Sequence, residues 1–164
     1  MRNCYFLLIF FMFYCGSAHA ERGDPMMAWP QLVEIDWDTY HEKMIENCRV
    51  KFPENAISFQ NAISKWNDHN AAAILDIRRQ IKDRIKSTKG LSESEVTNQM
   101  DLLSNKLTET FLNLVANTPE NEWKDVCTGK YASETLSAMD FEKYLPIISK
   151  AIPAFRDDYL LPVK

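Results

Sequence analysis

The stretch that decides the fold runs from Pro53 to Gly90 and reads PENAISFQNAISKWNDHNAAAILDIRRQIKDRIKSTKG. Its inward-facing positions recur every three or four residues and hold a period near 3.6 over about seven turns. They are Phe59, Ile63, Trp66, Asn70, Ala73, Ile74, Ile77, Ile81 and Ile85. Proline suits the first turn of a helix, and glycine suits the left-handed conformation that ends one. We therefore expect one long helix here, and we expect it to be the central element of the fold.

The weak point of this stripe is Trp66-Asn67-Asp68-His69-Asn70, where polar, turn-prone residues interrupt the apolar pattern. One interpretation is a kink or break in the helix, with amides that cap backbone groups and with Trp66 in the core. On that interpretation Trp66 should be the most buried aromatic residue of the helix. The alternative is an exposed recognition patch, because tryptophan and adaptable amides are typical of binding hot spots. Trp66, Asn67, Asp68, His69 and Asn70 are therefore the candidate partner-binding residues.

Further helices are predicted on both sides of this stretch. The preceding one begins near Asp36 or Asp38 and stops before Pro53, because proline disfavours the helical conformation in the residue before it. A capping box, Ser92 to Glu95, starts the following helix. The next begins with Thr118 as cap and Pro119 in first position, and a last one begins near Asp140. Strand alternation and hairpin signals are absent, so we expect an all-α, four- to five-helix bundle with antiparallel neighbours.

The first twenty residues are typical of a cleavable signal peptide. Arg2 precedes an apolar run from Tyr5 to Tyr14, and Ala18-His19-Ala20 puts small residues before a cut at Glu21. The run is too short to cross a bilayer, which needs roughly 20 residues of helix. The expected organisation is a signal peptide at 1–20, a flexible leader at 21–35 and the helical bundle at 36–164. Such a chain would be periplasmic or secreted, without stable membrane insertion after cleavage.

Two cysteines, Cys48 and Cys127, remain after cleavage. Disulfides form in oxidising compartments, so an exported chain with two cysteines is expected to join them. Both residues fall on apolar faces of predicted helices. The bond would tie the end of the first helix to the fourth segment, across the long hairpin between them.

The net charge and the absence of known motifs argue against several classes of function. The formal charge is −4, and it becomes −5 when Arg2 is lost, which argues against nucleic acid as the partner. The two remaining histidines, His41 and His69, have no second ligand at metal-site spacing. Nucleophile elbows, phosphate loops and Cys-X-X-Cys pairs are missing. We therefore expect no cofactor, no metal and no catalytic set.

Two functions are consistent with these observations. The first is a binding module that presents an acidic face to another exported protein, as an inhibitor or an immunity factor does. The second is a carrier, whose aromatic and isoleucine-rich interior holds a small apolar ligand. A deep apolar cavity would favour the carrier, and a surface without one would favour the binding module.

Overall fold

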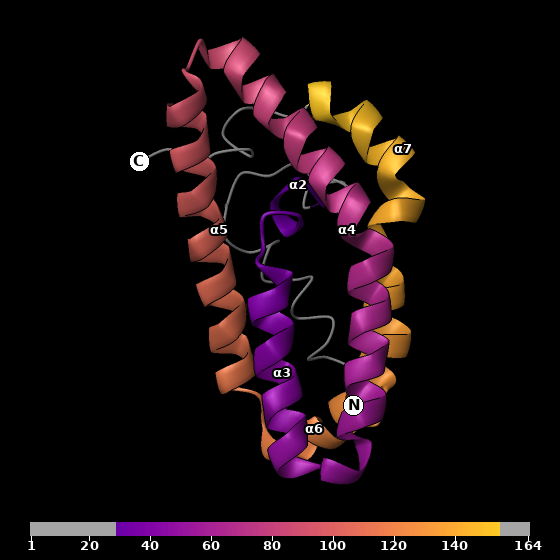
Figure 1. Cartoon of the computed structure of the whole chain (residues 1–164). Helices are drawn as coiled ribbons and strands as arrows, with labels where there is room; N and C mark the ends of the chain where they lie inside the picture. Colours follow the sequence, from indigo (N-terminus) through magenta and orange to yellow (C-terminus); the bar gives the residue numbers. More distant parts are fainter. Residues whose placement is uncertain (1–28, 155–164) are drawn as a thin grey trace, which may run out of the picture.

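The computed structural model describes residues 29–154, and these form six α-helices without a β-strand (Figure 1). The helices are α2 (Trp29–Leu32), α3 (Trp37–Lys51), α4 (Pro53–Lys89), α5 (Glu93–Ala116), α6 (Glu120–Cys127) and α7 (Phe141–Ala151). A π-helix, η2 (Tyr131–Leu136), and a 3₁₀ turn, η3 (Ile152–Ala154), complete the described chain. The all-α prediction is confirmed, and the helix number is slightly higher than expected.

Helix α4 is the central element, as its sequence predicts. It runs unbroken over 37 residues, and Gly90 ends it at φ 62°, where its N–H donates to the Lys86 carbonyl. The predicted interruption at Trp66–Asn70 is not a break, since α4 is continuous there, although its axis changes direction near the middle of the helix (Figure 1). Trp66 is buried at 7% exposure, but Phe59 is more buried at 1%, so the expectation that Trp66 is the most buried aromatic is wrong.

Helix ends follow their sequence signals with one exception. Asp36 caps α3 by accepting from the Thr39 N–H, and the capping box of Ser92 and Glu95 is complete. Thr118 does not cap α6. Its hydroxyl donates to the Leu114 carbonyl at 2.9 Å, so it belongs to the end of α5. Pro119, expected in the first helical position, instead precedes α6 as its N-cap residue.

The helices do not all run antiparallel to their neighbours. Helix α3 lies between α5 and the first half of α4. Each of these three helices reverses the direction of the one before it, so α3 and α5 lie side by side and run parallel (Figure 1). The segment from η2 to α7 also runs parallel to α4. Asn70 binds the start of α7, while Gln80 Nε2 donates to Ser149 Oγ at 2.9 Å near its end. The C-terminal segment therefore contacts α4 along successive turns.

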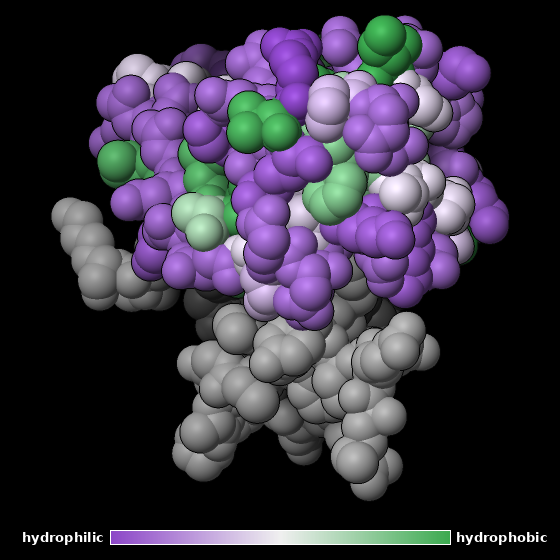
Figure 2. All heavy atoms as spheres, turned by 90° about the horizontal axis from the view of Figure 1, so that it is seen from below, coloured by the Kyte–Doolittle hydropathy of each residue, from purple (hydrophilic) through white to green (hydrophobic). Residues whose placement is uncertain are grey.

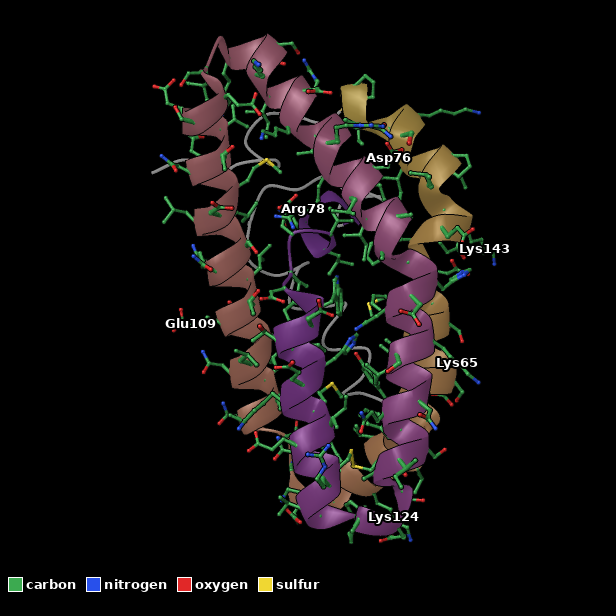
Figure 3. All side chains as sticks on the ribbon, in the orientation of Figure 1. Lys65, Asp76, Arg78, Glu109, Lys124 and Lys143 are labelled. Atoms are coloured by element: carbon green, nitrogen blue, oxygen red, sulfur yellow. A yellow bond between two sulfur atoms is a disulfide. The ribbon has the colours of Figure 1, made fainter. Side chains whose placement is uncertain are left out.

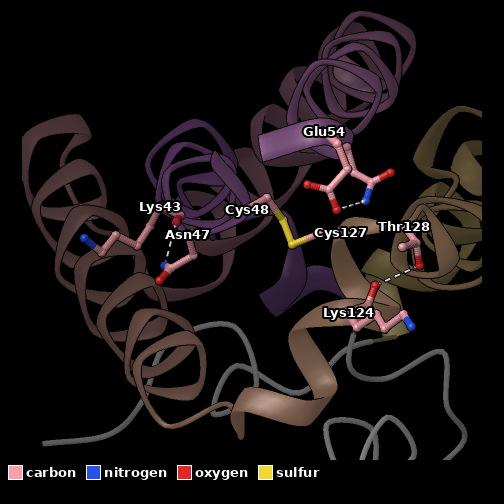
Figure 4. Close-up of a disulfide and its surroundings, with 8 residues drawn as sticks. Lys43, Asn47, Cys48, Glu54, Lys124, Cys127 and Thr128 are labelled. Atoms are coloured by element: carbon pink, nitrogen blue, oxygen red, sulfur yellow. Dashed lines mark hydrogen bonds between the residues drawn. A yellow bond between two sulfur atoms is a disulfide. The ribbon is translucent and has the colours of Figure 1, made fainter. Parts of the chain in front are cut away.

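The predicted disulfide is present between Cys48 and Cys127, with Cα atoms 5.4 Å apart (Figure 4). It joins the last turn of α3 to the last residue of α6. Both cysteines are buried, at 0% and 1% exposure. The bond thus closes one end of the bundle.

The packed core begins earlier than the predicted domain start at residue 36. Leu32, Val33 and Ile35 are buried and belong to the same cluster as the α3 and α4 side chains. Residues 31–35 are therefore part of the bundle, because their apolar side chains fill the space beside α4. The predicted signal peptide at 1–20, and the leader up to residue 28, lie outside the described residues.

Within residues 29–154, no helix combines the length and the apolar character that a membrane span requires.

Candidate functional site

The segment Trp66–Asn70 lies midway along α4, where α3 packs on one side and the η2–α7 segment on the other. Trp66 and Asn70 point into the core, whereas Asp68 and His69 are exposed and Asn67 is half-buried. The five candidate residues are thus divided between interior and surface. A helix imposes this division, since positions four apart share a face and the positions between them do not.

Trp66 is a core residue with a bonded polar end. Its indole N–H donates to the carbonyls of Leu136 and Met139, both at 3.0 Å. Its ring lies at 5.1 Å from that of Trp37 and at 5.9 Å from that of Phe141, centroid to centroid. The side chain therefore joins α4 to the end of η2 and to the loop before α7.

Asn70 is fully buried and caps α7. Its Oδ1 accepts from the backbone N–H groups of Phe141 at 2.7 Å and Glu142 at 3.2 Å, two groups that helix geometry leaves without an internal partner. Its Nδ2 donates to the Trp66 carbonyl at 2.9 Å. The interpretation in which Trp66 fills the core and the amides cap backbone groups holds for these two residues.

Asn67 faces α3 and forms a relay with two of its side chains. Its Nδ2 donates to Asp38 Oδ1 at 2.9 Å, and its Oδ1 lies 3.0 Å from Nδ1 of His41. His41 is 1% exposed, and burial lowers its pKa to about 4, an effect that the bond to Asn67 only partly opposes. His41 is therefore neutral at physiological pH.

His69 faces α7 and lies between two carboxylates. Its Nε2 is 3.2 Å from Asp140 Oδ1, and its Nδ1 is 2.8 Å from Glu142 Oε2. Because both ring nitrogens are engaged, the imidazole links α4 to the cap and first turn of α7.

Beside His69 the surface carries a depression of about 190 Å³ that opens to solvent. Its walls come from α4, from η2 and from the loop before α7. The lining residues are Ala62, Trp66, His69, Asn70, Ala132, Leu136, Ser137 and Asp140. Trp66, His69 and Asn70 thus lie on one concave surface, while Asn67 and Asp68 are not part of its lining.

Glu34 and the Tyr131 hydroxyl are buried polar groups whose partners the sequence did not predict. Glu34 is 1% exposed, and its Oε2 lies 3.1 Å from Nε of Arg78, which points inward from α4 (Figure 3). Burial raises the pKa of Glu34 to about 7, and Arg78 lowers it only in part. The Tyr131 hydroxyl hydrogen-bonds that of Tyr40, and burial raises the pKa of both phenols. No sequence signal marked either pairing, since each partner comes from a distant element.

Within residues 29–154, no group of three or more His, Cys, Asp or Glu side chains could hold a metal ion. Comparison with protein-family models, with curated proteins and with solved structures finds no match to this chain.

Proposed function

We propose that this chain is an exported helical binding module that acts by contacting another exported protein, in the manner of an inhibitor or an immunity factor. The site is the surface around the depression, with His69, Ser137 and the first turn of α7 at its rim.

The observation that carries the proposal is the size and openness of the depression. Pockets for carried or metabolised small molecules are typically about 300–1,000 Å³ and enclose most of the ligand. The depression here has about 190 Å³ and opens to solvent. It suits one protruding group of a larger partner better than an enclosed ligand, which favours the binding module over the carrier.

The scaffold beneath the depression supports a binding role because its parts are tied together. Trp66 and Asn70 attach η2 and α7 to α4, and the disulfide joins α3 to α6. A surface that is already ordered loses little conformational entropy when it binds, and this benefits affinity.

The exposed surface indicates that the contact is polar. Large exposed apolar side chains are scattered over four helices, as Val50, Ile57, Leu75, Leu102 and Ile147. On the face seen in Figure 2, hydrophobic side chains occur as separate spots in a mainly hydrophilic surface. Partner recognition would therefore depend on charge and hydrogen bonding around a small concavity.

Export is the second part of the proposal. The N-terminal pattern supports a signal peptide that is cut before Glu21, and a buried disulfide is consistent with an oxidising compartment. Mass spectrometry of the extracytoplasmic fraction should find a mature N-terminus at Glu21. An intact Met1 on membrane-bound protein would contradict export.

In-cell photo-crosslinking tests the binding role directly. A photoreactive amino acid replaces Ser137, an exposed residue that lines the depression, and a matched variant carries it at Leu102, an exposed residue on α5. We expect a discrete adduct with one other exported protein from position 137 and none from position 102. The proposal is wrong if both positions give the same adducts, or if native mass spectrometry shows a bound small molecule in place of a protein.

A further inference from the structure

The depression beside His69 has a chemical character that identifies the group it would receive. One carboxylate, that of Asp140, lines it, and a second, that of Glu142, lies outside the lining against the other nitrogen of the His69 ring. Ser137 adds a hydroxyl at the wall. Ionised carboxylates only accept hydrogen bonds, so the site favours a donor with positive charge.

We propose that this depression binds an arginine side chain of the partner protein, an inference that rests on the proposed function. The guanidinium would pair with the carboxylates of Asp140 and Glu142, and its methylene stem would lie along Ala62, Ala132 and Leu136.

The carboxylates are held in place before the partner arrives. Asp140 Oδ1 accepts from the Lys143 N–H at 2.9 Å, as the cap of α7, and it also contacts His69 Nε2. Its side chain keeps 27% exposure and that of Glu142 keeps 58%, so both remain accessible to an incoming donor. Held acceptors cost little reorganisation on binding, which favours a planar donor such as guanidinium over a flexible ammonium.

Size and shape also fit arginine. A depression of about 190 Å³ is smaller than the pockets that enclose whole ligands and suits a single side chain. Trp66 contributes aromatic surface to the wall, and guanidinium groups stack on aromatic rings. Arginine is also one of the residues enriched in binding hot spots.

The nearest lysines of these helices do not fill the site. Lys65 precedes His69 by one turn of α4, and Lys143 follows Asp140 in α7. Figure 3 shows both side chains extending outward from the bundle, and the Lys143 ammonium lies 5.1 Å from the centre of the Tyr144 ring.

An NMR titration of the full mature chain tests the proposal with N-acetyl-arginine amide as the probe. We expect saturable shifts of the Trp66 indole N–H and of the Ala132, Ser137 and Asp140 amides. N-acetyl-lysine amide should bind more weakly, and the neutral citrulline analogue should produce no shifts.

Three variants and one control make the test specific. Asp140→Asn keeps a residue that caps helices well, and Glu142→Gln changes an exposed side chain, so both should fold. Each should weaken probe binding by about 5-fold, as expected for the loss of a favourable exposed ion pair. Ala62→Leu should abolish binding by filling the depression without changing charge. Glu109→Gln, which makes the same charge change on α5, should bind as the wild type does.

The outcomes separate this inference from the proposed function. Shifts that are absent, or that are equal for the arginine and citrulline probes, would overturn the arginine site. An unchanged crosslinked partner in Ala62→Leu would also overturn it, while leaving the binding function intact. If Asp140→Asn and Ala62→Leu weaken probe binding but the chain crosslinks to no protein, the arginine site is supported and the proposed binding function is contradicted.

Discussion

At the scale of single residues, exposed Asp38 sets the direction of a hydrogen-bond relay that ends at buried His41. A carboxylate only accepts, so Asn67 must turn its amide nitrogen to Asp38 and its oxygen to His41. His41 therefore donates from Nδ1, and its other nitrogen, Nε2, carries the lone pair. Within the described residues Nε2 is buried without a hydrogen-bond partner. Protonating this nitrogen would place a charge in an aromatic core, which is why the pKa of His41 is low.

We predict that His41 makes the fold sensitive to acid. Its pKa is about 4 in the folded chain against 6.5 in the unfolded one, so only the unfolded chain binds the proton between these values. This contribution to stability is complete above about pH 6.5 and is lost as the pH falls towards 4, by about 2–3 kcal/mol at pH 4.5. Urea unfolding at pH 7.5 and 4.5 should show that His41→Phe lacks this loss.

His69→Gln is the control, because His69 is half exposed and lies outside the core. The unfolding free energy of His41→Phe should fall less than that of the wild type on acidification. If His41→Phe and the wild type lose the same unfolding free energy on acidification, His41 accepts a proton in the folded state.

Glu34 is predicted to change the stability of the fold with pH in the direction opposite to that of His41. Its pKa is about 7 in the folded chain against 4.5 in the unfolded one, so the folded chain retains a proton that the unfolded chain releases. Stability from this group is complete below about pH 4.5 and is lost as the pH rises through 7, by about 3 kcal/mol in total. Glu34→Gln should therefore lose less unfolding free energy than the wild type between pH 5 and 8 in urea.

Glu109→Gln controls for the change of charge in that comparison, since Glu109 is exposed on α5. If Glu34→Gln and the wild type have parallel pH profiles, the Arg78 pair keeps Glu34 ionised in the folded chain. The two buried groups have opposite slopes between pH 4.5 and 6.5, so each variant should reveal a slope that the wild type partly conceals.

At the scale of elements, α7 depends on a cap from another helix. Asn70 of α4 binds two N–H groups of the first turn of α7, while Asp140 caps the same turn from within the chain. Asn70→Leu should leave those two groups unsatisfied and cost about 2–4 kcal/mol. Hydrogen exchange should show faster exchange at Phe141 and Glu142, with little change in α5.

Asp140→Asn is the matched comparison, since asparagine caps helices as well as aspartate does. It should leave hydrogen exchange in α7 nearly unchanged. If Asn70→Leu melts within a degree or two of the wild type, water or Asp140 serves those N–H groups and the cross-helix cap is dispensable.

Helix ends were predictable where one residue and its near neighbours decide them. The capping box of Ser92 and Glu95 starts α5, and Gly90 ends α4. Each bonds only to residues a few positions away, so the local sequence predicts it. The Thr118 side chain could either cap α6 or bond to the last turn of α5, and it donates to the Leu114 carbonyl of α5. The π-helix η2 carries no such signal, and its course follows α4, where Phe59 meets Tyr131 and Trp66 binds Leu136.

At the scale of the whole molecule, the Cys48–Cys127 disulfide is predicted to be a main source of stability. It closes a loop with a sequence separation of 79, for which the chain-entropy model gives an upper value of about 4–5 kcal/mol. The double variant Cys48→Ala, Cys127→Ala should unfold at lower urea concentration than the oxidised wild type. Far-ultraviolet circular dichroism should show that it keeps its helices.

Reduced wild-type protein provides the control, because it lacks the bond but keeps both sulfur atoms. It should behave as the double variant does. If reduction leaves the urea midpoint unchanged, the unfolded chain holds these two segments close without the bond, and the entropy argument does not apply.

The sequence by itself determined the helical class, the central helix, most helix ends and the pairing of two cysteines. These follow from periodicity, from caps and from an even cysteine number, each of which is a property of a short stretch or of composition. The burial of α4 could be predicted for the same reason, since a 3.6-residue repeat marks one face along its whole length.

Only the tertiary structure decided the roles of Trp66, Asn67, His69 and Asn70. In sequence they are one polar interruption, but their partners lie 26 to 73 residues away, in α3 and in the segment from Leu136 to Glu142. A polar side chain in a helix can cap, break or recognise, and which of these it does depends on the group that packs against it. The same holds for the depression beside His69, because three separate segments must meet to form its walls.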